Sequence, residues 1–222
     1  MGKKIECYLD IVSPYSYHAF SYLQKNATAL ADFGVEIEFI PVFLGGINVG
    51  SGNKPPWTLP AKAAYSKYDG QRAQKFFGAK FNVPSWFPIL SLLPQRALTY
   101  IKQRYPKAQF ESAFLKCFMT MWNDQEQLDI SQPENLAKAL SGVFSAEEIK
   151  EILAAAADPK VKGELSAVTE KAVKELGAFG CPWFWVANGD GKTEPFFGSD
   201  RFHFMWDYLD LPFENLKLKA RI

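Results

Sequence analysis

Apolar side chains near the start of the chain follow two different spacings in turn. Residues 5–11 (Ile-Glu-Cys-Tyr-Leu-Asp-Ile) form a short β-branched and aromatic run that is typical of a strand. Between Tyr17 and Leu30 the spacing becomes helical, carried by Phe20, Leu23, Ala27 and Leu30. Gly34 interrupts this pattern, and residues 35–39 alternate as a half-buried strand. These elements predict a strand–helix–strand unit with parallel strands and a right-handed crossover.

The middle of the chain is predicted to be helical after a connecting loop. Residues 45–60 are rich in Gly, Pro, Ser and Asn and indicate an ordered loop, whereas residues 61–176 follow mostly helical spacing. Aromatic residues at four-residue steps predict a buried core stripe rather than a cofactor site: Phe110, Phe114, Phe118 and Trp122. Capping-box patterns predict two helix starts, Ser131 with Glu134 and Ser145 with Glu148.

The spacing returns to that of strands near the end of the chain. Residues 183–187 and 193–197 are predicted to pair around an Asn-Gly-Asp-Gly turn, and Ser199-Asp200 is expected to cap a final helix. This order of elements predicts an α/β thioredoxin-like fold with an all-helical domain inserted between its βαβ and ββα halves. Residues 1–60 and 177–222 then form the thioredoxin-like domain and residues 61–176 the insertion, because neither half alone covers a sheet.

Charge and cysteine content narrow the range of functions. The 222 residues include 25 Lys+Arg and 24 Asp+Glu, a balance that provides no field to attract nucleic acid or an anionic membrane. No apolar run is long enough to cross a bilayer. The three cysteines have neither C-x-x-C nor metal-ligand spacing, so no metal is expected and an intracellular reducing compartment is favoured. The final Ala-Arg-Ile only loosely matches a peroxisomal signal, which leaves peroxisome, mitochondrion and cytoplasm open.

Ser13 is the first candidate functional residue, because it lies where the predicted strand turns into the predicted helix. Pro14 then occupies a first-turn position, which needs no N–H partner. Unpaired backbone N–H groups and the positive end of the helix dipole favour an anion at this point, and a hydroxyl can donate a hydrogen bond to it. A lone serine here is also a common helix N-cap. The local sequence leaves both interpretations open.

Four blocks of sequence together resemble the kappa class of glutathione transferases. They are Asp-Ile-Val-Ser-Pro-Tyr-Ser-Tyr at 10–17, Ser-Gly-Asn-Lys-Pro-Pro at 51–56, Gly-Ala-Phe-Gly-Cys-Pro at 177–182 and Phe-Gly-Ser-Asp-Arg at 197–201. The blocks occur in family order and extend from the first strand to the last helix. The resemblance implies glutathione as co-substrate, a small hydrophobic electrophile as second substrate and a homodimer.

The resemblance also implies which residues bind glutathione near its sulfur. Ser13 would hydrogen-bond the sulfur, and Asn53 and Lys62 would contact the tripeptide. Lowering a thiol pKa by ~2 units requires ~2.7 kcal/mol of preference for the thiolate. One hydrogen bond to an ion provides about 1.5–3 kcal/mol and a helix N-terminus roughly 0.3–2 more, so Ser13 would suffice without a base.

The remaining implied contacts lie in the last two blocks. Cys181 would pair its backbone with the cysteinyl unit of glutathione, next to a cis Pro182. Ser199 and Asp200 would bind the γ-glutamyl end, with backbone N–H groups at a helix start holding its carboxylate. The family usually has an aliphatic residue where this chain has Cys181, whose thiol would lie near a bound thiolate and could form a mixed disulfide with it.

Other functions fit the residues less well or remain open. A serine hydrolase needs a base near its serine, and only His18 and His203 exist. Dithiol exchange needs cysteines at positions 13 and 16, which are both serine. A glutathione-dependent 2-hydroxychromene-2-carboxylate isomerase would use the same thiolate site and stays open, as does peroxide reduction. A non-catalytic thioredoxin-like peptide-binding module also stays open, although Asn53 suits glutathione better.

Overall fold

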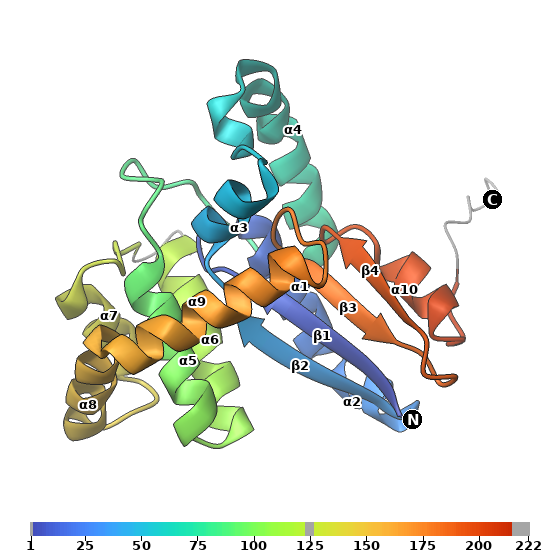
Figure 1. Cartoon of the computed structure of the whole chain (residues 1–222). Helices are drawn as coiled ribbons and strands as arrows, with labels where there is room; N and C mark the ends of the chain where they lie inside the picture. The colour runs from blue at the N-terminus through green and yellow to red at the C-terminus, as the bar shows by residue number, and fades with distance from the viewer. Residues whose placement is uncertain (1, 123–126, 215–222) are drawn as a thin grey trace.

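The computed structural model of the protein describes residues 2–122 and 127–214, and a four-stranded sheet lies at its centre (Figure 1). The strand order is β2-β1-β3-β4. Strand β1 (Lys3–Leu9) runs parallel to β2 (Val35–Pro41) and antiparallel to β3 (Trp183–Ala187), which pairs antiparallel with β4 (Thr193–Phe197). The predicted βαβ and ββα halves are therefore confirmed, and the pairing of β1 with β3 joins them into one sheet.

The first predicted helix is divided in two at Asn26. Helix α1 spans Pro14–Lys25 and helix α2 spans Ala27–Asp32. The Tyr22 carbonyl accepts both from the Asn26 amide at 3.2 Å and from Asn26 Nδ2 at 2.8 Å, so the Asn26 side chain bonds to the last turn of α1. Three of the four apolar residues that predicted a helix are buried, namely Phe20, Leu23 and Leu30, whereas Ala27 is exposed.

The prediction of a loop over residues 45–60 is wrong for its first half. Residues Leu44–Ser51 form helix α3, which ends at Gly52 with a left-handed φ of 73°. A Cβ at Gly46 would lie 3.0 Å from Thr169 Cγ2, and one at Gly50 would lie 3.2 Å from Val173 Cγ1. Both contacts are with helix α9 (Pro159–Lys174), so the glycines allow close helix packing here rather than a turn.

Helices follow one another through the inserted segment, as predicted, and most of them gather beside the β2 edge of the sheet (Figure 1). The aromatic stripe of α6 is core, since each of its four predicted rings is at most 3% exposed. The remaining helices are α4 (Pro60–Phe77), α5 (Leu92–Arg104), α6 (Lys107–Trp122), α7 (Pro133–Leu140), α8 (Ala146–Ala157), α9 (Pro159–Lys174) and α10 (Phe202–Tyr208), with a 3-10 turn at Pro56–Thr58.

One of the two predicted capping boxes forms. Ser145 accepts from the Glu148 amide, and the Glu148 carboxylate accepts from the Ser145 amide, at the start of α8. The other prediction is wrong, because α7 begins after Gln132 without a side-chain cap. Ser131 instead donates its hydroxyl to Asp129 Oδ1 at 2.6 Å, so the neighbouring acid takes the group that would have capped the helix.

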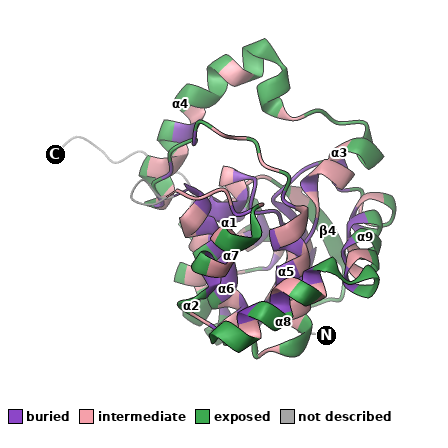
Figure 2. Cartoon of the chain, turned by 90° about the vertical axis from the view of Figure 1, so that its left-hand side faces the viewer, coloured by how far each residue is buried: buried purple, intermediate pink, exposed green. Residues whose placement is uncertain are grey.

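Helix α4 projects away from the rest of the molecule (Figures 1 and 2). Its side chains are mostly exposed, and Gly70 is its one fully buried residue. Tyr65 and Tyr68 are 57% and 64% exposed. The main polar tie between its middle and the body runs from Tyr15 to Asp69, where the hydroxyl donates to Oδ2 at 2.6 Å.

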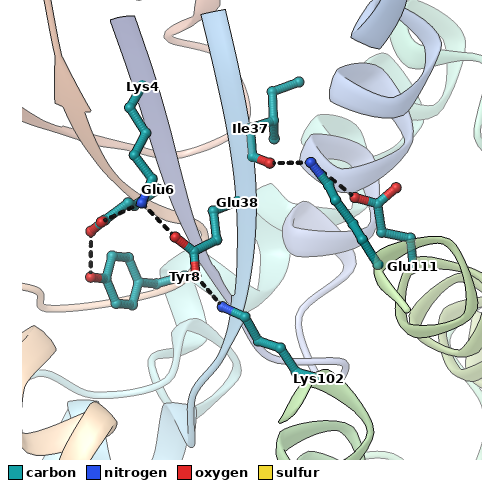
Figure 3. A network of polar contacts seen from close by, with 8 residues as sticks. Lys4, Glu6, Tyr8, Ile37, Glu38, Lys102 and Glu111 are labelled. Atoms are coloured by element: carbon teal, nitrogen blue, oxygen red, sulfur yellow. Dashed lines mark hydrogen bonds and ion pairs between the residues drawn. The ribbon is translucent and has the colours of Figure 1, made fainter. Parts of the chain in front are cut away.

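A chain of charged side chains crosses strands β1 and β2 (Figure 3). Glu38 accepts from Lys4 at 2.6 Å and also pairs with Lys102 of α5, while Glu6 accepts from Lys4 and from the Tyr8 hydroxyl. Burial alone would raise the pKa of Glu38, but the hydrogen bonds from Lys102 and Lys4 outweigh it and lower that pKa. The network therefore connects the sheet to α5 through ionised groups.

The final helix begins later than predicted. Residues 199 and 200 precede it, Arg201 is the N-cap, and no side chain caps α10. The predicted cap by Ser199-Asp200 is therefore wrong, and a helix start does not support Ser199 in binding a carboxylate. The hairpin before it is confirmed, with the Asn188 amide donating to the Lys192 carbonyl at 2.9 Å.

Candidate functional site

Ser13 lies at the turn from β1 into α1 and is 4% exposed. Its amide donates to the Asp10 carbonyl at 3.0 Å, and Pro14 begins the helix. The Ser13 Oγ accepts from the Ser16 amide at 3.2 Å and donates to the Cys181 carbonyl at 3.1 Å. The N-cap interpretation is thus confirmed, and the same hydroxyl also contacts the residue that was predicted to bind the cysteinyl unit.

Asp10 holds this turn against two other segments from a fully buried position. Its Oδ1 accepts from the Val12 amide at 3.0 Å, while its Oδ2 accepts from the Leu44 amide and the Ser91 hydroxyl, both at 2.7 Å. Burial raises the pKa of Asp10 to about 6, against the lowering effect of these three hydrogen bonds. The carboxyl group therefore fixes the Ser13 turn relative to the start of α3.

The peptide bond between Cys181 and Pro182 is cis, as predicted. Three contacts converge on the loop that contains it: from Ser13 to the Cys181 carbonyl, from Asn53 Nδ2 to the Phe179 carbonyl at 2.6 Å, and from the Gly198 amide to the Pro182 carbonyl at 3.1 Å. The loop at 179–182 thus brings together residues from both ends of the sequence.

Cys181 is buried, with 7% of the residue exposed. Burial, and to a smaller extent the Asp10 carboxylate, raises the pKa of this thiol well above its usual range. Cys181 is thus held in the thiol form, which is a poor nucleophile and disfavours a mixed disulfide. Its backbone remains the part that contacts Ser13.

A pocket of about 610 Å³ opens between helix α4, the loop that precedes β3 and the loop that follows β4. Cys181, Pro182, Ser199 and Asp200 line one wall. Gly198 has a φ of 89°, and a Cβ there would lie 2.8 Å from Asp200 Oδ1, so the turn that presents Ser199 and Asp200 to the pocket requires glycine. Three of the predicted residues therefore line the same pocket, Cys181, Ser199 and Asp200, and Ser13 contacts this group through the Cys181 carbonyl.

Asn53 and Lys62 lie outside this lining. Asn53 is exposed, and its amide is directed at the Phe179 carbonyl, so it contacts the cis-proline loop rather than the pocket. Lys62 is exposed in the first turn of α4. It precedes Asp69 of the pocket wall by seven residues, which places it on the same helix face about 10 Å along the axis.

The wall opposite the cis-proline loop contains residues that the sequence did not single out. Tyr15, Asp69, Arg72, Phe76 and Phe77 line this side of the pocket. Tyr15 lies within one of the blocks that carried the family resemblance, and the others come from α4. Their regular helical spacing was visible in the sequence, but no local pattern indicated that α4 faces the cis-proline loop.

His18 is not placed to remove the proton from a thiol bound at Ser13. His18 is fully buried one turn into α1, and neither ring nitrogen has a hydrogen-bond partner. Burial lowers its pKa to about 4, so it is neutral at pH 7. His203 lines the pocket beside Ser199 and Asp200, on the α10 side.

Metal and membrane sites are equally absent from the described part of the chain. Across residues 2–122 and 127–214, no group of three His, Cys, Asp or Glu side chains is arranged to hold a metal ion. Over the same residues, no helix has both the length and the apolar content that a membrane crossing requires.

Comparisons with known proteins agree with this architecture. A family model described as a DSBA-like thioredoxin domain matches residues 4–210. Glutathione S-transferase kappa 1 of Caenorhabditis elegans is 32% identical over 94% of this chain and 92% of its own length, and that of Homo sapiens is 33% identical over 90% and 88%. The solved structure of a 2-hydroxychromene-2-carboxylate isomerase matches with a TM-score of 0.72 at 22% identity, covering 93% of this chain and 94% of that one.

Proposed function

The chain belongs to the kappa-class glutathione transferases, within the DsbA-like thioredoxin family, and we propose that it activates the glutathione thiolate through the Ser13 hydroxyl and adds it to a small hydrophobic electrophile. One observation carries this proposal. Ser13 Oγ is buried at the N-terminus of α1 and donates to the carbonyl of Cys181, a residue of the cis-proline loop that lines the pocket.

The hydroxyl changes partner when glutathione binds. Without ligand it donates to the Cys181 carbonyl at 3.1 Å. In the complex it donates to the sulfur, and the Cys181 carbonyl becomes free to accept the amide of the cysteinyl unit. The thiol proton leaves to solvent, because a hydrogen bond and the dipole of α1 stabilise the thiolate that remains.

The rest of the tripeptide follows the pocket walls. Asp200 pairs with the γ-glutamyl ammonium and Ser199 contacts the same end. Lys62, on the pocket face of α4, supplies a cation for the glycine carboxylate. Asn53 acts mainly by donating to the Phe179 carbonyl, which fixes the cis-proline loop relative to the end of α3.

Substitution of Ser13 by alanine tests the proposal. We expect the pKa of bound glutathione to rise by about 1–2 units, or about 1.4–2.7 kcal/mol, with a smaller change in binding. Ultraviolet absorbance of the bound thiolate measures this pKa, and Ser16→Ala, one turn along α1, is the matched control. An unchanged titration curve in Ser13→Ala would refute serine activation.

The same base-free thiolate site could also serve an isomerase, in which glutathione adds to a conjugated substrate and then leaves. Parallel assays with 1-chloro-2,4-dinitrobenzene and with a 2-hydroxychromene-2-carboxylate separate the two reactions. Conjugation without isomerisation is the expected result. Peroxide reduction is measured with the same protein, because a thiolate at Ser13 can also attack a peroxide oxygen.

We also propose that the protein is a homodimer. The exposed aromatic side chains of α4, Tyr65 and Tyr68, are compatible with an interface between copies. Light scattering at micromolar concentration should give about twice the chain mass of 25.0 kDa. A mass equal to one chain would contradict this.

A further inference from the structure

We propose that Arg72 on helix α4 binds a carboxylate of the electrophile, so that anionic aromatic electrophiles are the preferred second substrates. The inference rests on the proposed function, because it concerns the same pocket. Four charged side chains line that pocket: Asp69, Arg72, Asp200 and Arg201. The two on the cis-proline side pair with each other, since Arg201 contacts Asp200. Asp69 and Arg72, on the α4 side, are the charged residues that remain to interact with a ligand.

The acid nearest to Arg72 in sequence is already engaged. Asp69 Oδ2 accepts from the Tyr15 hydroxyl at 2.6 Å, and Oδ1 accepts from the Tyr65 hydroxyl at 3.3 Å. Arg72 follows three residues later, at a spacing where helix side chains are neighbours. Even so, no hydrogen bond or ion pair joins Arg72 to any residue within 2–122 or 127–214. The tyrosines leave the guanidinium without a partner at the pocket wall.

The surroundings of Arg72 suit an aromatic ligand. Tyr15, Phe76 and Phe77 line the same wall, and Phe76 is 72% exposed. Small-molecule sites commonly combine an apolar lining with one or a few polar groups that fix orientation. A guanidinium binds a carboxylate through two parallel hydrogen bonds, a geometry that an ammonium or an amide does not provide. An aromatic ring with a carboxylate substituent would therefore use both features.

Glutathione does not require Arg72. In the proposed complex its ammonium pairs with Asp200, Ser199 contacts the same γ-glutamyl end, and its glycine carboxylate lies near Lys62. Arg72 then remains available to the second substrate, on the wall that faces the thiolate. The inferred substrate class is thus an activated aromatic or conjugated electrophile that carries a carboxylate.

4-Chloro-3-nitrobenzoate and its neutral amide form a matched pair of probes. With either probe, the thiolate sulfur bonds to the chlorine-bearing carbon, and its electron pair passes into the nitro-substituted ring. The pair then returns to expel chloride, so that thiolate and aryl chloride give a thioether and a chloride ion. The two probes differ only in the charge of the group that Arg72 would contact.

The measurement is the ratio of kcat/KM for the benzoate to kcat/KM for the benzamide, in wild type and in three variants. We expect Arg72→Gln to lower this ratio about ten-fold, which corresponds to ~1.4 kcal/mol. Arg72→Lys should retain part of the preference. Lys75→Gln removes a positive charge from the same helix outside the pocket lining, and it should leave the ratio unchanged.

Two other outcomes would overturn the assignment of Arg72. An equal ratio in wild type and Arg72→Gln overturns the assignment of Arg72. Equal losses with both probes, together with a higher KM for glutathione, would assign Arg72 to glutathione and overturn it as well. If wild type conjugates neither probe nor 1-chloro-2,4-dinitrobenzene, the proposed function fails. Arg72 is then judged by calorimetry with the unreactive 3-nitrobenzoate and 3-nitrobenzamide, whose affinities must differ in the same way.

Discussion

Replacing His18 with phenylalanine should change how the stability of this protein depends on pH. The imidazole is packed against the rings of Tyr17, Phe77 and Phe81, at centroid distances of 6.2, 5.2 and 5.4 Å. No charged group contributes to the lowering of its pKa from 6.5 to about 4, which comes from burial alone. The site is therefore an apolar box that excludes the protonated form of His18.

The direction in which pH changes the free energy of unfolding depends on whether the folded or the unfolded state binds the proton first. Between pH 6.5 and about 4 the unfolded chain protonates His18 and the folded protein does not, so acidification favours unfolding. The difference of about 2.5 pKa units corresponds to about 3 kcal/mol lost between pH 7 and pH 4. His18→Phe should remove this loss. At pH 7 the variant should be as stable as wild type or more so, because it buries no unpaired nitrogen.

Asp10 acts in the opposite direction over the same pH range. Its pKa rises on folding from 3.8 to about 6, so the folded protein takes up this proton first. Acidification from pH 6 to pH 4 therefore stabilises the fold by about 3 kcal/mol through Asp10. The two effects nearly cancel in wild type, which means that only a variant lacking one of the groups exposes the other.

Urea unfolding followed by tryptophan fluorescence, at fixed protein concentration and from pH 4 to pH 7, measures both effects. The free energy of unfolding of His18→Phe should rise relative to wild type by about 3 kcal/mol as the pH falls from 7 to 4. Leu23→Ala, on the same helix, is the control and should cost about 2–5 kcal/mol equally at every pH. Parallel curves for wild type and His18→Phe would refute the reasoning.

Two further predictions concern single carboxylates. Asp200→Asn should lower glutathione affinity by about 1.5–3 kcal/mol in calorimetry, without weakening the binding of a ligand that lacks the γ-glutamyl amine. Because the ion pair of Asp200 with Arg201 is exposed, folding stability should fall by less than ~1 kcal/mol. Equal affinity losses for both ligands would contradict the role of Asp200. Glu38→Gln should lower the free energy of unfolding by roughly 1 kcal/mol at pH 7, because it removes the carboxylate that Lys4 and Lys102 share. Since the pKa of Glu38 is lowered on folding, this difference should vanish in urea titrations as the pH falls through that pKa. A difference that persists in acid would contradict the prediction.

Periodicity was sufficient to predict the sheet and most of the helices, because those elements bury one regular face. The change from strand spacing to helix spacing and back gave the βαβ and ββα halves, and Ser145 with Glu148 marked a real helix start. Family blocks then gave the position of Ser13 and the cis bond before Pro182. Each of these patterns involves residues that are close in sequence, so it could be recognised without knowledge of the tertiary structure.

The errors arose where a tertiary contact decides what a residue does. Gly46 and Gly50 indicated a loop, but they face α9 so closely that a Cβ at either would lie only 3.0–3.2 Å from its side chains. Ser131 matched a cap pattern, but its hydroxyl is taken by Asp129. Arg72 gave no signal at all, because its place in the pocket depends on how α4 projects over the cis-proline loop.

In the proposed mechanism, the part of the site that activates glutathione is separate from the part that selects the electrophile. Ser13, Asn53 and Gly198 all hydrogen-bond to the loop at 179–182, so the thiolate side is fixed by several contacts with the sheet and its neighbours. Helix α4 forms the other wall and is held at its middle by the Tyr15–Asp69 contact. If the proposal is correct, substitutions on α4 should alter which electrophile is accepted, or whether the adduct is released or isomerised, without disturbing Ser13. Reaction specificity in this fold should accordingly follow the pocket-facing residues of α4 more closely than those around Ser13.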